Sequence, residues 1–185
     1  MDESPWHVLD KRLTLDRSPW LKVWDEDVQL PDGRVIHDWV RLEMPRYVLI
    51  FAVTVDGTVP FFRHYKHGIG RVLLDPPGGY VNPSEDPLVA AQRELLEETG
   101  MKAERWTPLA AFVVDSNREA GWGHLFLAQG ARKVAEPDAD DLEAYETILC
   151  PLDEVRTVWR SGQVQHAAAS SLIALSLDEL GAWQR

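Results

Sequence analysis

Three glutamates, Glu94, Glu97 and Glu98, follow one another at a spacing that could bind metal ions. In an α-helix, which turns by about 100° per residue, these three side chains would share one arc roughly 100° wide. Carboxylates on one helix face repel each other unless a positive charge lies between them. Because Mg²⁺ and Mn²⁺ prefer oxygen ligands, the spacing predicts a site for one of these divalent cations.

The flanking residues predict where this helix begins and ends. Asp86 is suited to cap the first turn, Pro87 fits the first helical position, and Gly100 suits the left-handed backbone that ends a helix. Before the helix, Gly78-Gly79 permits a backbone path that a side chain would obstruct. We therefore expect a helix over residues 87–99 with a tight glycine segment before it.

A second, apolar arc of the same helix predicts that it packs against the rest of the protein. Leu88, Ala91 and Leu95 share this arc, so the helix cannot turn its acidic side wholly into solvent. The alternative to a metal site is an amphipathic helix with a solvated acidic face. The chain has no cysteine–histidine pattern of the kind that binds structural zinc.

The spacing around this helix resembles the signature of the Nudix hydrolase family. The chain has Gly79, five residues, Glu85, seven residues and then the run Arg93 to Met101, which reads RELLEETGM, and every defined position fits. The resemblance implies a mixed α and β fold, the α/β/α sandwich of Nudix domains with a mixed sheet. It also implies a hydrolase in which water attacks phosphorus in a diphosphate linkage.

The resemblance assigns roles to individual residues. It implies that the metal ions are bound by the carboxylates of Glu94, Glu97 and Glu98 and by the main-chain carbonyl of Gly78. Glu94 and Glu98 would be the principal ligands, and Glu97 would be a further ligand or would hold a water. Glu85 and Arg93 would support this cluster, and Glu85 lies close enough in sequence to join it.

A general base is expected from outside the helix. In related ADP-ribose pyrophosphatases a glutamate on a loop after the signature acts as the base or binds a metal. Glu143 and Glu146 occupy the corresponding acidic stretch of this chain, and Asp140 and Asp141 are alternatives. A solvated acidic loop without a catalytic role is equally open for each of them.

The resemblance extends from about residue 8 to residue 180 and is to ADP-ribose and other nucleoside-diphosphate-sugar pyrophosphatases. It includes an Arg-x-Tyr-Lys pattern at residues 63–66, where Arg63 and Lys66 are candidates for phosphate contacts. ADP-ribose pyrophosphatases usually carry a proline about sixteen residues beyond the signature, and residues 114–118 lack one here. Other nucleotide sugars therefore stay open, with Arg118 a candidate to contact phosphate or sugar.

Two functional alternatives also stay open. The chain could hydrolyse another nucleoside diphosphate or triphosphate, or it could be a non-catalytic sensor of a nucleotide metabolite.

Four tryptophans are candidates to stack on a base, although each could equally be structural: Trp24, Trp39, Trp106 and Trp122.

The sequence predicts two parts. Residues 1–45 are expected to form a small antiparallel β unit, because the segment is rich in β-forming residues and has a turn signal at Pro31-Asp32-Gly33. Residues 46–185 are expected to form the Nudix domain. The resemblance implies a homodimer that shares the N-terminal strands, since such relatives commonly build the nucleotide pocket across the interface.

Within the second part, strands and helices can be placed coarsely. Strands are expected at 47–55 and, after an Asp56-Gly57 turn, at 59–68, and residues 71–79 lead into the signature. Two more strands are expected at 105–116 and 123–134, joined by a polar loop over Asn117–Gly123, and another at 147–152. Helices are expected at about 152–160 and 162–180.

Composition limits the class of protein. The 185 residues carry a net charge of −11 without a basic block, so duplex nucleic acid is not an expected partner. Cys150 is the only cysteine, which is compatible with a reducing compartment. The N-terminus lacks the apolar core of a signal peptide and the longest apolar run is too short to span a bilayer, so we expect a cytoplasmic protein without a membrane partner.

Overall fold

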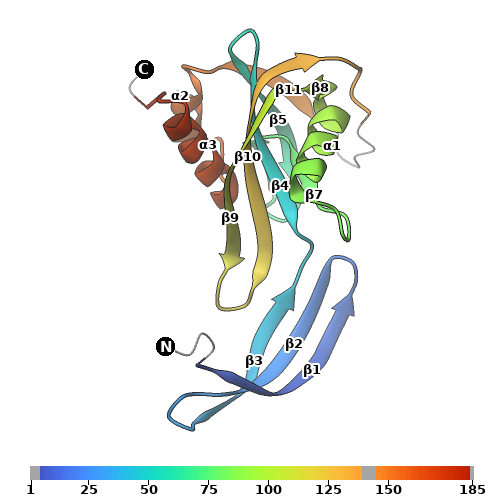
Figure 1. Cartoon of the computed structure of the whole chain (residues 1–185), viewed down its shortest axis with the longest axis vertical. Coiled ribbons are helices and arrows are strands. Elements are labelled where there is room, and N and C mark those ends of the chain that lie inside the picture. Colours follow the sequence, from blue (N-terminus) through green and yellow to red (C-terminus); the bar gives the residue numbers. More distant parts are fainter. Residues whose placement is uncertain (1–4, 139–144, 184–185) are drawn as a thin grey trace. The chain divides into compact units, whose positions relative to one another are not determined.

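The computed structural model describes residues 5–138 and 145–183 (Figure 1). The chain folds into two compact units. The first comprises Met1–Arg46 and Val113–Trp122, and the second comprises Tyr47–Phe112 and Gly123–Arg185. The candidate base Glu143, with its alternatives Asp140 and Asp141, lies outside the described residues.

The first unit is a three-stranded antiparallel sheet. Its strands are β1 (His7–Arg17), β2 (Leu21–Gln29) and β3 (Val35–Glu43), in the order β1-β2-β3. Gly33 closes the β2–β3 turn with a φ of 86°, a left-handed conformation that favours glycine. Residues 113–122 join this unit through main-chain hydrogen bonding, because Leu42 N–H donates to the carbonyl of Arg118 at 2.8 Å.

The second unit contains the remaining elements and two sheets. Its elements are β4 (Tyr47–Thr54), β5 (Thr58–Lys66), β6 (Arg71–Asp75), β7 (Gly78–Tyr80), α1 (Pro87–Thr99), β8 (Met101–Lys102), most of β9 (Arg105–Asp115) and β10 (Ala120–Lys133), β11 (Glu146–Pro151), α2 (Val155–Arg160) and α3 (Ala167–Glu179). One sheet has the order β7-β4-β10-β8, with β9 paired to β10, and the other has the order β11-β5-β6. The first of these is mixed, because β4 runs parallel to β10 and antiparallel to β7.

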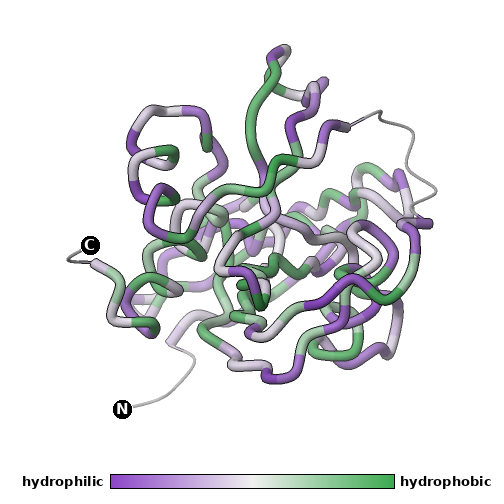
Figure 2. Tube along the Cα trace, turned by 90° about the horizontal axis from the view of Figure 1, so that it is seen from above, coloured by the Kyte–Doolittle hydropathy of each residue, from purple (hydrophilic) through white to green (hydrophobic). Residues whose placement is uncertain are grey.

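Strand β4 lies between two hydrophobic layers, because alternate side chains of a strand point to opposite faces. Val48, Ile50 and Ala52 pack with the buried residues of α1, whereas Leu49 and Phe51 pack with those of α3. The two helices therefore cover opposite faces of the strands, as Figure 1 shows. The alternation of hydrophobic and hydrophilic residues can be followed along the trace in Figure 2. The predicted α/β/α sandwich is confirmed.

Some predicted boundaries were wrong. The polar loop expected over Asn117–Gly123 is a turn of only four residues, 116–119, because β10 already begins at Ala120 and pairs with β9. The Asp115 carboxylate closes this turn by accepting from the N–H of Asn117 at 2.9 Å. Both C-terminal helices are present, but α2 and α3 start later than expected. No helix within the described ranges is long and apolar enough to cross a membrane.

Candidate active site

Helix α1 carries the three clustered glutamates, and its two ends are as predicted. The Asp86 carboxylate accepts from the main-chain N–H of Leu88 at 2.8 Å and of Val89 at 3.4 Å, which caps the first turn. At the other end, Gly100 adopts a φ of 69° and donates its N–H to the carbonyl of Leu96. These ends fix which residues lie in the last helical turn.

The apolar side of α1 fixes how the helix is rotated. Ala91 and Leu95 are fully buried, and both belong to the hydrophobic cluster that contains β4. Their burial leaves the acidic arc beside the packed face rather than opposite to it. Consequently the side chain of Glu94 is only 13% exposed, whereas that of Glu97 is 44% exposed.

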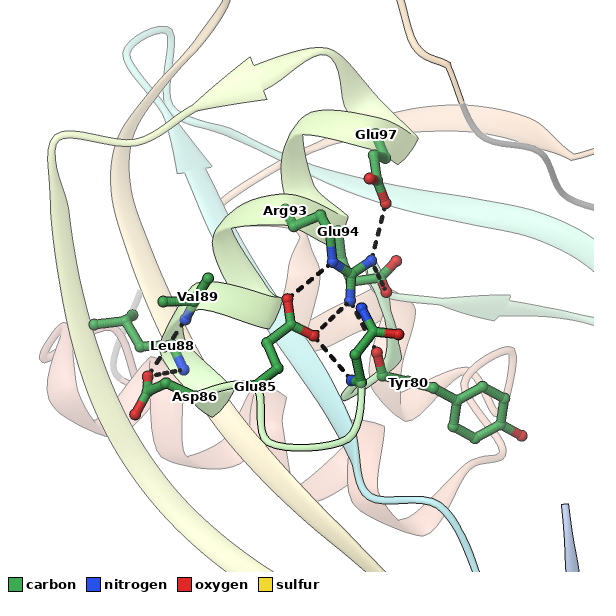
Figure 3. A network of polar contacts seen from close by, with 9 residues as sticks. Tyr80, Glu85, Asp86, Leu88, Val89, Arg93, Glu94 and Glu97 are labelled. Carbon is green, nitrogen blue, oxygen red and sulfur yellow. Dashed lines mark hydrogen bonds and ion pairs between the residues drawn. The ribbon is translucent and has the colours of Figure 1, made fainter. Parts of the chain in front are cut away.

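Arg93 lies at the centre of a network of carboxylates (Figure 3). Its guanidinium forms a two-pronged pair with Glu85, with both N···O distances at 3.1 Å. One terminal nitrogen also donates to Glu94 at 2.7 Å and to Glu97 at 3.0 Å, and the other donates to the carbonyl of Tyr80 at 3.0 Å. Arg93 therefore supplies positive charge between three of the acidic side chains.

The network shifts the ionisation of its members. The Arg93 guanidinium holds the pKa of Glu85 below its usual value, and the main-chain N–H of Asn82, which Glu85 accepts at 2.9 Å, acts in the same direction. In turn, Glu85 and then Glu94 raise the pKa of Arg93. Glu85 is thus a permanently charged support of the cluster at neutral pH.

The glycines of β7 bring backbone directly against the helix carboxylates. Gly78 N–H donates to Glu98 Oε2 at 2.8 Å. A Cβ at Gly79 would lie 2.5 Å from both carboxylate oxygens of Glu94, and a Cβ at Gly78 would overlap the main-chain oxygen of Val48. Neither position has room for a side chain, so the predicted close backbone path is present here.

The donor set fits a hard divalent cation. Within the described ranges no three His, Cys, Asp or Glu side chains converge as ligands of one ion. Instead, Glu94 and Glu97 share the Arg93 guanidinium, and Glu98 accepts from Gly78. The side chains gathered at this place are nevertheless carboxylates, whose oxygens Mg²⁺ and Mn²⁺ prefer, and the glycines leave no side chain between them.

Two polar contacts of the second unit were not predicted from the sequence. Tyr145 donates its hydroxyl to the main-chain carbonyl of Glu98 at 3.3 Å. His64 Nε2 lies 3.2 Å from Asp75 Oδ2, and both side chains are largely buried. In the sequence, the contact of Tyr145 is indicated only by the place of this aromatic residue directly after an acidic stretch. The His64–Asp75 pair depends on the β5–β6 register, which the sequence does not reveal.

Glu146, a candidate general base, is exposed and lies on the opposite face of its sheet from Phe62. It is the first residue of β11, opposite Arg63 on β5, and the two side chains form an exposed ion pair of 3.5 Å. Arg63 and Phe62 are successive on β5 and so point to opposite faces. Because Tyr145 packs on Phe62, Glu146 points away from the side on which Tyr145 reaches Glu98.

The other candidate substrate contacts belong to different units. Lys66 ends β5 and pairs in register with Arg71. Arg118 lies in the 116–119 turn, which belongs to the first unit, and pairs with Asp115 at 3.0 Å. All four candidate tryptophans interact with other residues of the chain: Trp24 lies beneath Lys11, Trp39 donates to the Asn117 carbonyl, Trp106 packs edge-on against Phe126, and Trp122 donates to Glu119.

Comparison with known proteins identifies the class to which this fold and site belong. The family model described as NUDIX domain matches residues 43–169, which is more than half of the chain. The chain belongs to the Nudix hydrolase family. The resemblance found in the glycine–glutamate spacing is therefore confirmed.

Two relatives of known activity and one solved structure are similar to this chain over most of its length. The chain is 35% identical over 174 residues to a CMP-5'-(N-acetyl-N-hydroxy-3-aminopropyl)phosphonate hydrolase of Streptomyces rubellomurinus, covering 92% of this chain and 82% of that protein. It is 32% identical over 157 residues to an ADP-ribose pyrophosphatase of Mycobacterium tuberculosis, covering 81% and 73%. A crystal structure of an ADP compounds hydrolase shares its fold with a TM-score of 0.81, 22% identity and 97% coverage of both chains.

Proposed function

We propose that this chain is a divalent-metal-dependent pyrophosphatase. It hydrolyses the diphosphate bond of ADP-ribose or a related nucleotide sugar to a nucleoside monophosphate and a sugar phosphate. The observation that carries the proposal is the placement of the Glu94 and Glu98 carboxylates against the backbone of Gly78-Gly79 in a Nudix chain. The ADP-ribose pyrophosphatase among its relatives supports the substrate class.

The metal site is assigned to the oxygen groups of α1 and β7. Glu94, Glu97 and Glu98 and the main-chain carbonyl of Gly78 would hold Mg²⁺ or Mn²⁺, with Glu85 at the edge of the site. A bound divalent cation polarises a phosphoryl oxygen and lowers the pKa of a coordinated water. Their position on a rigid helix and a short strand supports this assignment, because rigid elements hold ligands in fixed geometry.

The chain's own residues prepare and support the reaction. Arg93 holds Glu85, Glu94 and Glu97 in one orientation through hydrogen bonds. A carboxylate then takes the proton of the attacking water, the bridging P–O bond breaks, and the leaving phosphate keeps the bridging oxygen. Glu143 is the candidate for this base. Glu146 would first have to leave its ion pair with Arg63.

Substrate binding is assigned to basic side chains outside α1 and to a second subunit. Arg63, Lys66 and Arg118 are the proposed contacts for phosphate or sugar. We also propose that the N-terminal β unit, residues 1–45, forms a homodimer. Exposed apolar side chains on β1 support this, since Val8 is 52% and Leu9 55% exposed. The cytoplasmic location expected from the sequence stays a prediction.

A second candidate substrate is a CMP-linked phosphonate. Among the relatives described above, the one that acts on such a compound has the higher identity and the higher coverage of both chains. The region that lacks the expected proline, residues 114–118, also leaves the sugar and base open. Both candidates place a nucleotide phosphate next to the same metal site.

A product-resolved substrate panel tests the proposal. The protein is incubated with Mg²⁺ and, separately, with ADP-ribose, GDP-mannose, UDP-glucose, a CMP-linked phosphonate and nucleoside triphosphates, and the products are chromatographed. We expect a nucleoside monophosphate and a sugar phosphate from at least one nucleotide sugar, and no turnover with EDTA. Turnover of the CMP-linked phosphonate alone would favour the second candidate, and turnover of none would refute a hydrolytic role.

A matched pair of variants links the rate to the metal site. Glu98→Gln replaces a proposed ligand, and Glu104→Gln changes an exposed glutamate that pairs with Arg132. Glu98→Gln should lower the rate by about 100-fold or more, because loss of a ligand disturbs metal activation, while Glu104→Gln should leave it unchanged. A nucleotide sensor would instead bind nucleotide with no rate to lose.

A further inference from the structure

The last turn of α1 presents main-chain carbonyls that need partners from outside the helix. An α-helix leaves its final four carbonyls without intrahelical hydrogen bonds. Gly100 N–H satisfies the carbonyl of Leu96 at 2.8 Å. The next two carbonyls belong to Glu97 and Glu98, which are proposed metal-binding residues. What holds these two carbonyls therefore also holds two members of the metal site.

Two residues distant in sequence supply the missing donors. The main-chain N–H of Asp138 donates to the carbonyl of Glu97 at 2.8 Å, and the hydroxyl of Tyr145 donates to the carbonyl of Glu98 at 3.3 Å. Only the second donor is a side chain, so only it can be removed by a conservative substitution. These two hydrogen bonds show that Asp138 and Tyr145 both hold the end of α1.

Tyr145 is itself fixed by the sheet. Its ring packs on Phe62 of β5 with a centroid separation of 4.5 Å, and Phe62 is only 2% exposed. Glu98 is also held through its carboxylate, which accepts from the N–H of Gly78 on β7. Glu98 is therefore clamped at two points: its carbonyl by a tyrosine seated on β5, and its carboxylate by β7.

We propose that Tyr145 is a positioning residue for the metal site, which acts through Glu98. Its hydroxyl fixes the main chain at Glu98, and this sets where the Glu98 carboxylate lies relative to Gly78 and Glu94. The inference rests on the proposed function, because it assumes that Glu98 is a metal ligand. Partners that orient a metal ligand commonly change metal affinity or activity by about 10–100-fold when they are removed.

Tyr145→Phe tests this, because it keeps the ring on Phe62 and removes only the donor. Mn²⁺ affinity is measured by the loss of the free-ion electron paramagnetic resonance signal, which does not depend on turnover. We expect the dissociation constant for Mn²⁺ to rise about tenfold. The Mg²⁺ concentration for half-maximal activity should rise by the same factor, while KM for the nucleotide at saturating metal stays within about twofold.

Tyr47→Phe is the matched control. The Tyr47 hydroxyl is buried and has no hydrogen-bond partner within the described ranges, so its removal costs no hydrogen bond. Tyr47 also lies on β4, in the hydrophobic cluster that packs with α3. We expect this variant to bind Mn²⁺ like the wild type and to melt at the same or a higher temperature.

The outcomes separate a positioning role from a structural one. A Tyr145→Phe variant with a lower melting temperature and wild-type Mn²⁺ affinity would show a structural role only and overturn the proposal. A variant with wild-type melting temperature and wild-type Mn²⁺ affinity would also overturn it. Wild-type protein that binds Mn²⁺ but turns over no nucleotide would refute the proposed activity, while the Mn²⁺ measurement on Tyr145→Phe would still decide the positioning role.

Discussion

Replacing Arg93 by methionine should destabilise the protein through the carboxylates left behind. The substitution keeps an unbranched side chain of similar length and removes five hydrogen bonds, two to Glu85 and one each to Glu94, Glu97 and the Tyr80 carbonyl. Glu85 and Glu94 are only 14% and 13% exposed. Without the guanidinium, two poorly solvated carboxylates would lie close together with no cation between them.

The size of the effect follows from burial. A hydrogen bond to a charged group contributes about 1.5–3 kcal/mol, but these bonds share one guanidinium and do not add. Breaking a fully buried ion pair costs about 3–5 kcal/mol, and Arg93 is 29% exposed, which reduces the figure. We therefore expect the free energy of unfolding to fall by about 2–4 kcal/mol, which lowers Tm by roughly 5–15 °C in a domain of this size.

Urea and thermal unfolding with and without Mg²⁺ measure this effect. Mg²⁺ can provide positive charge to Glu94 and Glu97 in place of Arg93, so it should stabilise Arg93→Met more than the wild type. Arg132→Met is the control, because Arg132 forms one exposed pair with Glu104, of the kind that contributes less than about 1 kcal/mol.

Two results would refute the reasoning about Arg93. If Arg93→Met loses no more stability than Arg132→Met, the guanidinium does not hold the carboxylate cluster together. If Mg²⁺ stabilises Arg93→Met and the wild type equally, the arginine and the cation do not compensate the same charges. The first result would leave the short distances around Arg93 without an energetic role.

Two further predictions concern the same cluster. Arg93 and the Asn82 N–H lower the pKa of Glu85 in the folded protein below its ordinary value of 4.5, so the unfolded chain binds more protons below that pH and stability is lost as pH falls through the folded pKa. In urea unfolding across this range, the free energy of unfolding should fall less steeply with decreasing pH in Arg93→Met than in the wild type. Equal slopes for the two proteins would contradict this prediction. Gly79→Ala should keep the fold but weaken Mg²⁺ activation about tenfold or more, since its Cβ would displace the Glu94 carboxylate. Gly78→Ala would meet the main chain of Val48 instead and should lower the free energy of unfolding by about 1–3 kcal/mol. Calorimetry and kinetics measure both variants, and wild-type Mg²⁺ activation in Gly79→Ala would contradict the prediction.

Features that depend on neighbouring residues could be predicted from the sequence. Asp86 and Gly100 define the ends of α1 through hydrogen bonds within four residues, and these were found as expected. The short continuous apolar run over residues 47–55, ended by the Asp56-Gly57 turn, likewise identifies β4, because both signals are local. The spacing of the glutamates predicted a shared helix face for the same reason.

Features that depend on strand pairing could not be predicted. Glu146 is acidic and follows the signature at a suitable distance, but its pairing with Arg63 places it on the opposite face of the sheet from Phe62 and Tyr145. Tyr145, the residue directly before β11, contacts Glu98 while its ring packs on Phe62 of β5. A single-residue change in register would exchange these two faces, and sequence spacing contains no information on it.

The position of the acidic cluster on α1 explains why so many donors gather at the end of this helix. Glu97 and Glu98 lie in its last turn, where the helix dipole is negative and disfavours further anions, and α1 has no basic residue there to offset it. Tyr145 and the Asp138 N–H reduce that negative field by satisfying the carbonyls, and Arg93 neutralises the carboxylate of Glu97. A bound divalent cation would relieve the same repulsion, so the repulsion at this end of the helix favours cation binding at the proposed site.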